Sequence, residues 1–268
     1  MKGTAVEYTI VIPSYRREHI LRANTLKVLD KTDVECDIVV FTADEEETAR
    51  YKKVLPENIQ VVTGVRGIPN QRNFIQKYYP VGKKLVFIDD DISSLIGLNE
   101  EGKRVKATKL HDFFIDAFKI TEVQGMKMFG INSTNSNLEM KFRASIGRIY
   151  LVGNFYGLIN THTDMVDTGE EIPTRKDYKA GKESHERALQ HWERYGGVIK
   201  FRSYGVVSKY WGVPGGHQVS RTADGEKEAT LFLNRKYPDA TDVRIYKGVY
   251  DLVIKAKTKV MDIAFIQD

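Results

Sequence analysis

The sequence predicts an α/β protein with a Rossmann-like, mostly parallel central sheet flanked by helices. Through the first hundred residues, short runs rich in β-branched and aromatic residues alternate with helix-like segments. Such alternation is typical of parallel sheets. The fourth run, residues 84–88, is apolar after its first residue and ends in three consecutive aspartates. A buried strand with a functional carboxyl end has this pattern.

The expected elements of the first half follow one another closely. Strands are expected at residues 6–12, 36–41, 59–62 and 84–88, and helices at 20–29, 45–54 and 70–79. The segment 45–54 begins with acids and ends with bases, which suits the dipole of a helix. No G-x-G-x-x-G follows the first strand and no Walker loop occurs, so dinucleotide binding and P-loop nucleotide hydrolysis are disfavoured.

The second half is less regular. Helices are expected at residues 110–123, 182–195 and 229–237, strands at 128–131, 149–159, 198–201, 243–246 and 252–254, and loops at 97–106, 132–141 and 161–176. We find no repeat and no linker. The sequence therefore predicts one domain over residues 1–268, with a nucleotide-type half at 1–97 and an elaborated half at 98–268.

Composition narrows the functional classes. A single cysteine, Cys36, excludes an internal disulfide and a cysteine-based zinc site, and favours a reducing, cytoplasmic setting. No apolar signal segment and no run of about 20 apolar residues is present, so we expect no membrane association. The net charge of +5 permits a polyanionic partner. Nothing in the sequence indicates an obligate protein partner.

The acidic triplet at the end of the fourth strand is the strongest candidate site. Side chains alternate along an extended chain, so Asp89 and Asp91 are expected to point one way and Asp90 the other. Two convergent carboxylates suit Mg²⁺ or Mn²⁺, which would hold a diphosphate. The alternative is a solvated acidic turn that ends a strand.

Four segments at expected strand ends resemble the GT-A glycosyltransferase fold. They are Pro13-Ser14-Tyr15-Arg16, Asp44, the stretch from Arg66 to Asn73 that contains Gly67-Ile68-Pro69-Asn70-Gln71-Arg72-Asn73, and Asp89 to Asp91. The resemblance implies that Pro13, Tyr15 and Arg16 begin a nucleotide pocket and that Asp44 reads the base. It further implies that Arg66, Arg72, Asn73, Asp89 and Asp90 bind the donor and that Asp91 binds the metal.

The same resemblance suggests a general base in the second half. Inverting GT-A enzymes often carry Gly-Glu-Asp at a helix start, and Gly181-Lys182-Glu183 looks like that element, with Glu183 at the position of the base. Lys182 departs from the pattern, and Glu170-Glu171 is a rival placement. An ordinary acid at a helix N-terminus is the alternative for Glu183.

His217, in a Gly-rich turn, matches the late histidine that GT-A enzymes bring to the metal or diphosphate. A neutral imidazole would complete a site built from Asp91 and phosphate oxygens. The alternative is a surface loop histidine. Arg16, Arg66 and Arg72 are each suited to a diphosphate, and each has the alternative of a solvated charge.

The whole chain also resembles the TET/JBP-associated glycosyltransferases, which include the kinetoplastid base J enzyme and bacteriophage relatives. The resemblance is carried by residues 12–17, 67–73 and 87–92 and by the turn at 210–216. It implies transfer of a sugar from a UDP-sugar, with UDP-glucose as the expected donor, onto the hydroxymethyl group of 5-hydroxymethylcytosine or 5-hydroxymethyluracil in DNA. The reaction is expected to be inverting, to need Mn²⁺ or Mg²⁺, and to occur in the host cytoplasm if a phage encodes the protein.

Scattered cations give separate support for a DNA acceptor. They are Lys103, Arg104, Lys106, Lys109, Lys141, Arg143, Arg148, Arg175, Lys176 and Lys179. Several adjoin aromatic residues or polar loops, as in surfaces that follow phosphates. A solvated charged face is the alternative. Two other functions stay open: a GT-A enzyme acting on a glycan or small molecule, and an inactive GT-A-like DNA-binding module.

Overall fold

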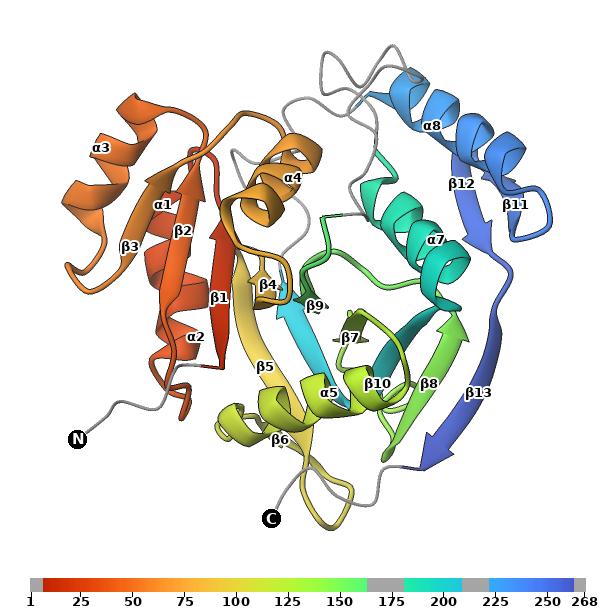
Figure 1. The fold of residues 1–268 in the computed structure, drawn as a ribbon, viewed down its shortest axis with the longest axis horizontal. Helices are drawn as coiled ribbons and strands as arrows, with labels where there is room; N and C mark the ends of the chain where they lie inside the picture. The colour runs from red at the N-terminus through yellow and green to blue at the C-terminus, as the bar shows by residue number, and fades with distance from the viewer. Residues whose placement is uncertain (1–6, 163–180, 209–221, 263–268) are drawn as a thin grey trace.

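The computed structural model describes residues 7–162, 181–208 and 222–262, and its centre is one large mixed sheet (Figure 1). The sheet has eleven strands in the order β13-β8-β10-β7-β9-β4-β1-β2-β3, with β5 pairing to β10 and to β6. This confirms the α/β class with a central sheet between helices.

The first half forms the elements that its periodicity predicts. The strands are β1 (Tyr8–Pro13), β2 (Ile38–Thr42), β3 (Gln60–Thr63) and β4 (Lys84–Ile88). The helices are α1 (Glu18–Leu21), the π-helical turn η1 (Arg22–Leu26), α2 (Lys27–Leu29), α3 (Glu45–Val54) and α4 (Ile68–Tyr78). All neighbours in the order β3-β2-β1-β4 are parallel, so their carboxyl ends lie on one edge.

The second half extends this sheet and adds a small outer unit. Its strands are β5 (Ile92–Leu98), β6 (Arg104–Lys106), β7 (Met128–Asn132), β8 (Arg143–Arg148), β9 (Phe155–Ile159), β10 (Val198–Ser208), β11 (Thr241–Tyr246), β12 (Val249–Ile254) and β13 (Lys257–Asp262). Its helices are α5 (His111–Val123), α7 (Glu183–Tyr195) and α8 (Ala223–Lys236). Antiparallel β9 separates β4 from β7, which therefore run in the same direction.

Several expectations for the second half are wrong in detail. Residues 97–106 are only partly a loop, because β5 and β6 pair as a hairpin on either side of residues 99–103. Strand β9 begins only at Phe155, strands β8 and β13 were not predicted, and β10 continues to Ser208. Helix α8 begins six residues earlier than expected. Strands β6 and β13 are exposed, and their polar residues hide the strand pattern.

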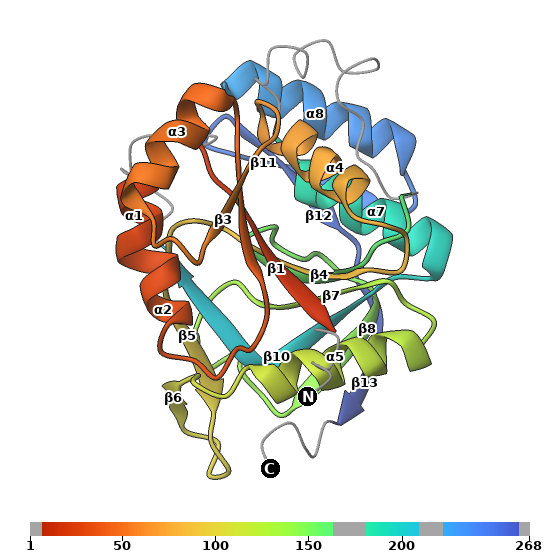
Figure 2. The ribbon, with the colours of Figure 1, turned by 60° about the vertical axis from the view of Figure 1, so that its left-hand side comes forward.

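Helices cover both faces of the sheet (Figure 2). One face packs against α1, α2, α3 and α5 in a core that includes Leu21, Tyr51 and Phe113. The other face lies under α4 and α7, where Ile75 packs with Phe87 and Val198. Because β4 is buried on both sides, its residues 85–88 are all 1% exposed or less. This rigid strand carries the aspartate triplet.

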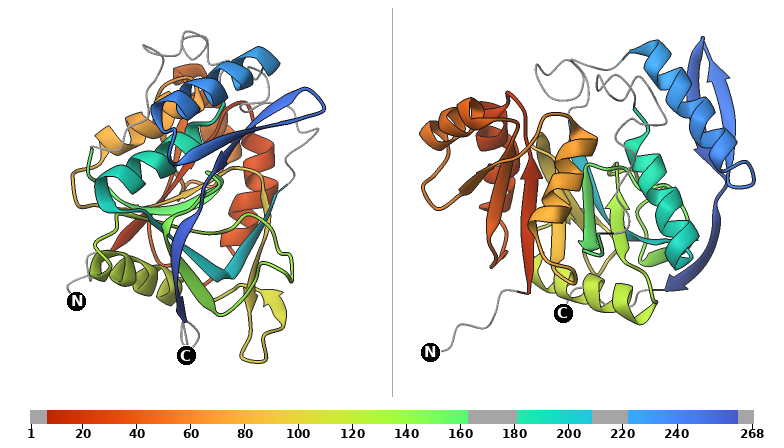
Figure 3. Two further views of the ribbon diagram at one scale, coloured as in Figure 1. Left: turned by 90° about the vertical axis from the view of Figure 1, so that its right-hand side faces the viewer. Right: turned by 45° about the horizontal axis from the view of Figure 1, so that its top comes forward.

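Helix α8 and the β11–β12 hairpin lie outside the main sheet, beside α7 (Figure 3). They pack on it through a separate apolar cluster that includes Leu189, Leu233 and Leu252. Among the described residues, we find no helix that combines the length and the apolar composition needed to cross a bilayer.

Candidate functional site

The candidate site lies where β1, β2 and β4 end. Since these strands are parallel neighbours, the turn after β1, Asp44 after β2 and the triplet after β4 share one edge of the sheet. This is the edge at which open α/β sheets bind ligands. The structure thus brings together segments that are widely separated in the sequence.

Asp90 points into the protein, but it lies in the turn after β4, where strand alternation no longer applies. Its carboxylate accepts a hydrogen bond from Ser14 Oγ at 2.6 Å and meets Arg17 Nη1 at 3.0 Å. Ser14 is also bonded to the Tyr51 hydroxyl, which accepts from the Arg17 backbone N–H. With Asp90 4% exposed, any effect of this residue on a ligand passes through Ser14 and Arg17.

Asp89 and Asp91 flank this buried carboxylate and are more accessible. Asp91 Oδ2 lies 3.3 Å from Arg17 Nη1, and Asp89 Oδ1 lies 2.9 Å from Arg72 Nη2. Burial raises the pKa of Asp89 to about 7 and that of Asp90 to about 6, although Arg72 and Arg17 oppose the shifts. Since a third of the Asp89 side chain is exposed, solvent offsets part of its shift. The triplet is a concentration of negative charge that a cation would stabilise.

Arg72 is the hub that joins the triplet to the second half. Its guanidinium contacts Glu183 Oε2 at 2.6 Å, Asp89 at 2.9 Å and the Gly153 carbonyl oxygen at 2.6 Å. It also lies over the Tyr156 ring, 5.6 Å from the centroid. Arg72 is 3% exposed. It therefore reaches a ligand mainly through the acids that it positions.

Glu183 begins α7 between two arginines. Besides Arg72, it meets Arg187, one helical turn later, at 3.1 Å. Although burial opposes ionisation, these two cations and a hydrogen bond from Ser184 lower the pKa of Glu183 to about 2. Glu183 is therefore an ionised carboxylate held in place by buried charges.

Gly153 leaves the room that this arrangement needs. A Cβ at this position would lie 2.5 Å from Arg72 Nη1 and 2.5 Å from Ser184 Oγ. Since real Cβ atoms do not approach other atoms so closely, the start of α7 and Arg72 depend on a glycine here.

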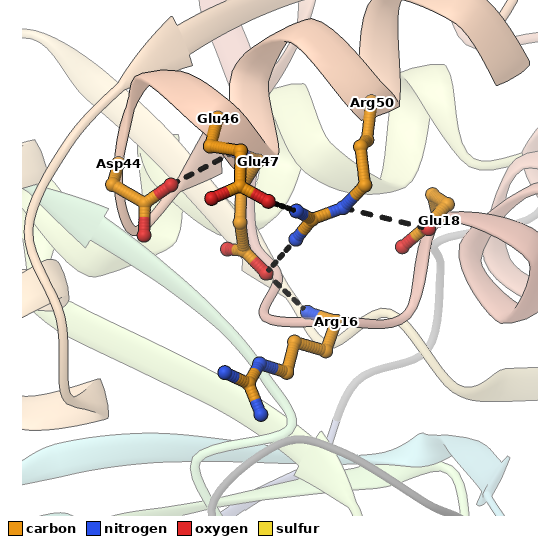
Figure 4. Close-up of a pocket in the computed structure, with 6 residues that line it drawn as sticks. All are labelled: Arg16, Glu18, Asp44, Glu46, Glu47 and Arg50. Atoms are coloured by element: carbon orange, nitrogen blue, oxygen red, sulfur yellow. Dashed lines mark hydrogen bonds and ion pairs between the residues drawn. The ribbon is translucent and has the colours of Figure 1, made fainter.

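A pocket of about 370 Å³ opens beside the end of β2 (Figure 4). It is lined by Arg16, Glu18, Asp44, Glu46, Glu47 and Arg50. Asp44 caps α3 by accepting from the Glu47 N–H through Oδ1, at 2.8 Å. The Glu47 carboxylate in turn accepts a hydrogen bond from the Arg16 backbone N–H at 2.8 Å. Arg16 has a positive φ of 55°, and this hydrogen bond stabilises that conformation. Side chains from α3 thus shape the turn after β1.

Two expected donor-binding cations lie against one aromatic ring. Arg16 and Arg66 approach the ring of Tyr15, at 5.1 and 5.6 Å from its centroid. Both arginines are exposed and neither forms an ion pair with a described acid. Their positions suit an anionic ligand at this edge.

The chemistry of the triplet suits a hard divalent cation. Asp89 and Asp91 supply carboxylate oxygens, and each meets its arginine through one oxygen only. Among the described residues, no group of three His, Cys, Asp or Glu residues is placed to hold a metal. A cation here would need further ligands, which phosphate oxygens and water can supply.

Several predicted site residues lie elsewhere or beyond the described part of the chain. Pro13 is the buried last residue of β1, and Asn73 is buried in α4. His217 and the rival base Glu170-Glu171 fall outside the described residues. Strand β10 ends at Ser208, which pairs with Ile92 directly after the triplet.

Sequence reasoning did not assign roles to Arg17, Glu47 or Arg187. Arg17 stands next to a predicted site residue, but nothing in its pattern distinguishes it from Arg16. The Glu183-Arg187 spacing of four residues was the available signal for a helical ion pair. Glu47 resembled any acid in the first turn of a helix.

Comparison with known proteins leaves the family open. No protein-family model and no curated protein sequence matches this chain. Among solved structures, TarS residues 1–349 of S. aureus has a TM-score of 0.46 at 14% identity, with 87% of this chain and 72% of that chain covered. A nucleotide-diphospho-sugar transferase described as putative, from Desulfovibrio desulfuricans, has a TM-score of 0.45 at 10% identity, covering 76% and 84%. With similarity this low, we base the function on the residues of the site itself.

Proposed function

We propose that this protein is a metal-dependent glycosyltransferase that moves a sugar from a UDP-sugar to the hydroxymethyl group of a modified pyrimidine in DNA, with inversion. The observation that supports this most is the shared edge of β1, β2 and β4. A base-sized pocket, exposed arginines and the carboxylates of Asp89 and Asp91 all lie at this edge. A nucleoside, a diphosphate and a metal would each need one of these three features.

The pocket beside β2 is proposed to hold the nucleoside. The Oδ1 atom of Asp44 caps α3, and the carboxylate lies at the pocket wall, where it would accept the N3–H of uracil. Tyr15 would pack against the nucleoside, while Arg16 and Arg66 would face the diphosphate. These roles assign the exposed cations to the most highly charged part of the donor.

Asp89 and Asp91 are proposed to hold Mn²⁺ or Mg²⁺, with His217 as a further ligand. The bound metal would neutralise charge that develops on the departing UDP. This chain's own contribution is to fix the carboxylates, because Arg72 orients Asp89 and Arg17 orients Asp91. Asp90 in turn holds Arg17 through an ion pair, and Ser14 orients Asp90 by a hydrogen bond.

Two roles are proposed for Glu183. As a general base it would accept the proton of the acceptor hydroxyl while that oxygen attacks the anomeric carbon. As a positioning residue it would hold Arg72 against Asp89. Its pKa of about 2 and its contacts with Arg72 and Arg187 favour the positioning role, because such a carboxylate is a weak base.

Accessible cations on the second half support a DNA acceptor. Lys106, Lys109 and Lys141 are exposed, and Arg148 stacks on Trp192 at 4.5 Å. Arg175, Lys176 and Lys179 lie outside the described residues. Exposed cations of this kind are suited to the phosphates of a duplex.

Transfer can be tested by incubating the protein with Mn²⁺, UDP-glucose and duplexes that contain 5-hydroxymethylcytosine, 5-hydroxymethyluracil or neither. Digestion to nucleosides and mass spectrometry should reveal a hexose only on a hydroxymethylated base. Other UDP-sugars extend the panel. If the donor is hydrolysed but none of the duplexes gains a sugar, the acceptor belongs to another class of molecule.

A further inference from the structure

A group of three cations with few acidic neighbours lies on the adjacent strands β8 and β10. Arg143 is in β8, while Lys200 and Arg202 are in β10. The two strands are antiparallel, and their ladder reaches the pair Phe201 and Ala144. Beyond this pair the ladder is irregular, because the Arg202 carbonyl accepts from the Lys141 N–H and the Arg143 N–H donates to the Lys141 carbonyl. Arg143 and Arg202 therefore both lie at this end of the β8–β10 ladder.

Neighbouring like charges repel each other. Burial, and then the charge of Arg143, lower the pKa of Arg202, although Glu139 opposes the shift. Among the described residues, neither guanidinium forms an ion pair with a carboxylate. Asp262 is opposite Arg143 in β13, but it is exposed and forms no ion pair with it.

The hydrogen-bonding groups of this cluster are also incompletely used. Arg202 Nε donates to Ser145 Oγ at 2.9 Å, whereas Arg143 Nε is buried without an acceptor. Lys200 lies on the same face, with Glu139 at 3.7 Å as its acidic neighbour. Three cations thus share two nearby acids, and a buried N–H donor needs an oxygen.

A phosphate group would satisfy each of these conditions. It carries negative charge, it accepts several hydrogen bonds, and it matches the planar fork of a guanidinium. We propose that Arg143, Lys200 and Arg202 bind a backbone phosphate of a DNA duplex. The inference rests on the proposed function, because an enzyme that modifies DNA must hold the duplex outside its catalytic site.

Charge-removing variants test this site directly. Binding of a fluorescent duplex is measured by anisotropy over a range of salt concentrations for wild type, Arg143→Gln, Arg202→Gln and the control Lys52→Gln, an exposed residue of α3. Both arginine variants should bind more weakly. Their plot of log affinity against log salt should be less steep by about 0.9 for each phosphate that is no longer neutralised, while Lys52→Gln matches wild type. Wild-type affinity and slope in both arginine variants would overturn the proposal.

Thermal melting separates a binding role from a structural one. Without DNA, in chloride buffer, Arg202→Gln should melt close to wild type, because the loss of the hydrogen bond to Ser145 is offset by the removal of a repulsion. Arg202→Lys keeps the charge and should retain most of the affinity for DNA. A large loss of melting temperature in Arg202→Gln, with DNA binding lost equally in Arg202→Lys, would indicate a structural role and overturn the proposal.

Two further measurements separate the possible sources of phosphate and the two proposals. If inorganic phosphate stabilises wild type but not Arg202→Gln, while duplex binding is equal in both, the cluster is a free-anion site and the DNA assignment is wrong. If duplex binding falls in Arg202→Gln although no sugar reaches hydroxymethylated DNA, the phosphate site stands and glycosyl transfer is rejected.

Discussion

Arg72 connects three segments of the candidate site through its guanidinium. A buried guanidinium that contacts two carboxylates and a carbonyl oxygen fixes α4, the end of β4 and the start of α7 relative to one another. Removing one partner from such a buried group is costly, on the order of 3–5 kcal/mol. Small changes around Arg72 should therefore affect the site before they affect the fold.

Gly153→Ala is such a small change. Its new methyl group would press on Arg72 and Ser184, so we expect the rate of transfer to fall at least tenfold. Overpacking should also reduce the stability by about 1–3 kcal/mol. Activity assays and thermal melting measure the two effects. Gly82→Ala is the control, because its strained φ of 86° costs stability with no atom nearby, and it should leave activity unchanged.

Glu183→Gln distinguishes the two roles proposed for that residue. If Glu183 positions Arg72, the variant should bind UDP and Mn²⁺ more weakly, because Asp89 loses its orientation. If Glu183 is the general base, donor binding should persist while the rate falls by about 10²–10⁴. Calorimetric titration with UDP, beside single-turnover kinetics, gives both quantities. We expect weaker UDP binding.

At the scale of elements, α7 links the site to the outer unit of α8 and the β11–β12 hairpin. Lys182, directly before α7, adopts a left-handed conformation and contacts Glu226 of α8 at 3.5 Å and Asp251 of β12 at 3.0 Å. Because Glu183 is the next residue, the position of this outer unit bears on the site.

His185 should make the attachment of α7 sensitive to acid. Burial, and then the charge of Lys182, lower its pKa to about 4, although Asp251 and Glu226 oppose the shift. An unfolded histidine titrates near 6.5, so the unfolded chain binds the proton more tightly. The stability from neutral His185 is complete above pH 6.5 and is lost as the pH falls towards 4.

A pH series of denaturation curves measures this contribution. Between pH 6.5 and 4, wild type should lose on the order of 2 kcal/mol more than His185→Phe, which keeps a ring on Tyr150 but cannot be protonated. Parallel curves for the two proteins over this range would show that His185 is not the titrating group.

The elements of the first half were predictable because their signals are local. Segment 45–54 carries its own cap, acids and bases, and β4 is apolar throughout its buried part. Strands β8 and β13 were not predictable in this way. In β13, lysines alternate with threonine and valine on an exposed outer strand, and the pattern looks like a polar tail.

The candidate site was predictable only in part for the same reason. Strand-end positions follow from the topology, so the grouping of Asp44 with the triplet was within reach of the sequence. The contact between Arg72 and Glu183 spans 111 residues and leaves no periodic signal. Strand alternation also did not reveal that Asp90 and Asp91 share one partner, Arg17, because residues 90 and 91 lie in a turn.

For the whole molecule, the parallel first half forms the edge at which we propose that the donor binds, and the second half adds strands, cations and α7. The proposed reaction requires both parts, since one would hold the nucleotide and the other the acceptor. A binding module would use only the cationic surfaces, and its aspartate triplet would have no function.

The most direct measurement is UDP release from UDP-sugars with Mn²⁺ by wild type and Asp91→Ala, using hydroxymethylated and plain duplexes. Asp239→Ala, at an exposed acid between α8 and β11, is the matched control. The proposal predicts release that requires hydroxymethylated DNA, persists in Asp239→Ala and falls at least a hundredfold in Asp91→Ala. UDP release that is equal in Asp91→Ala and wild type, or duplex binding with no release at all, would contradict it.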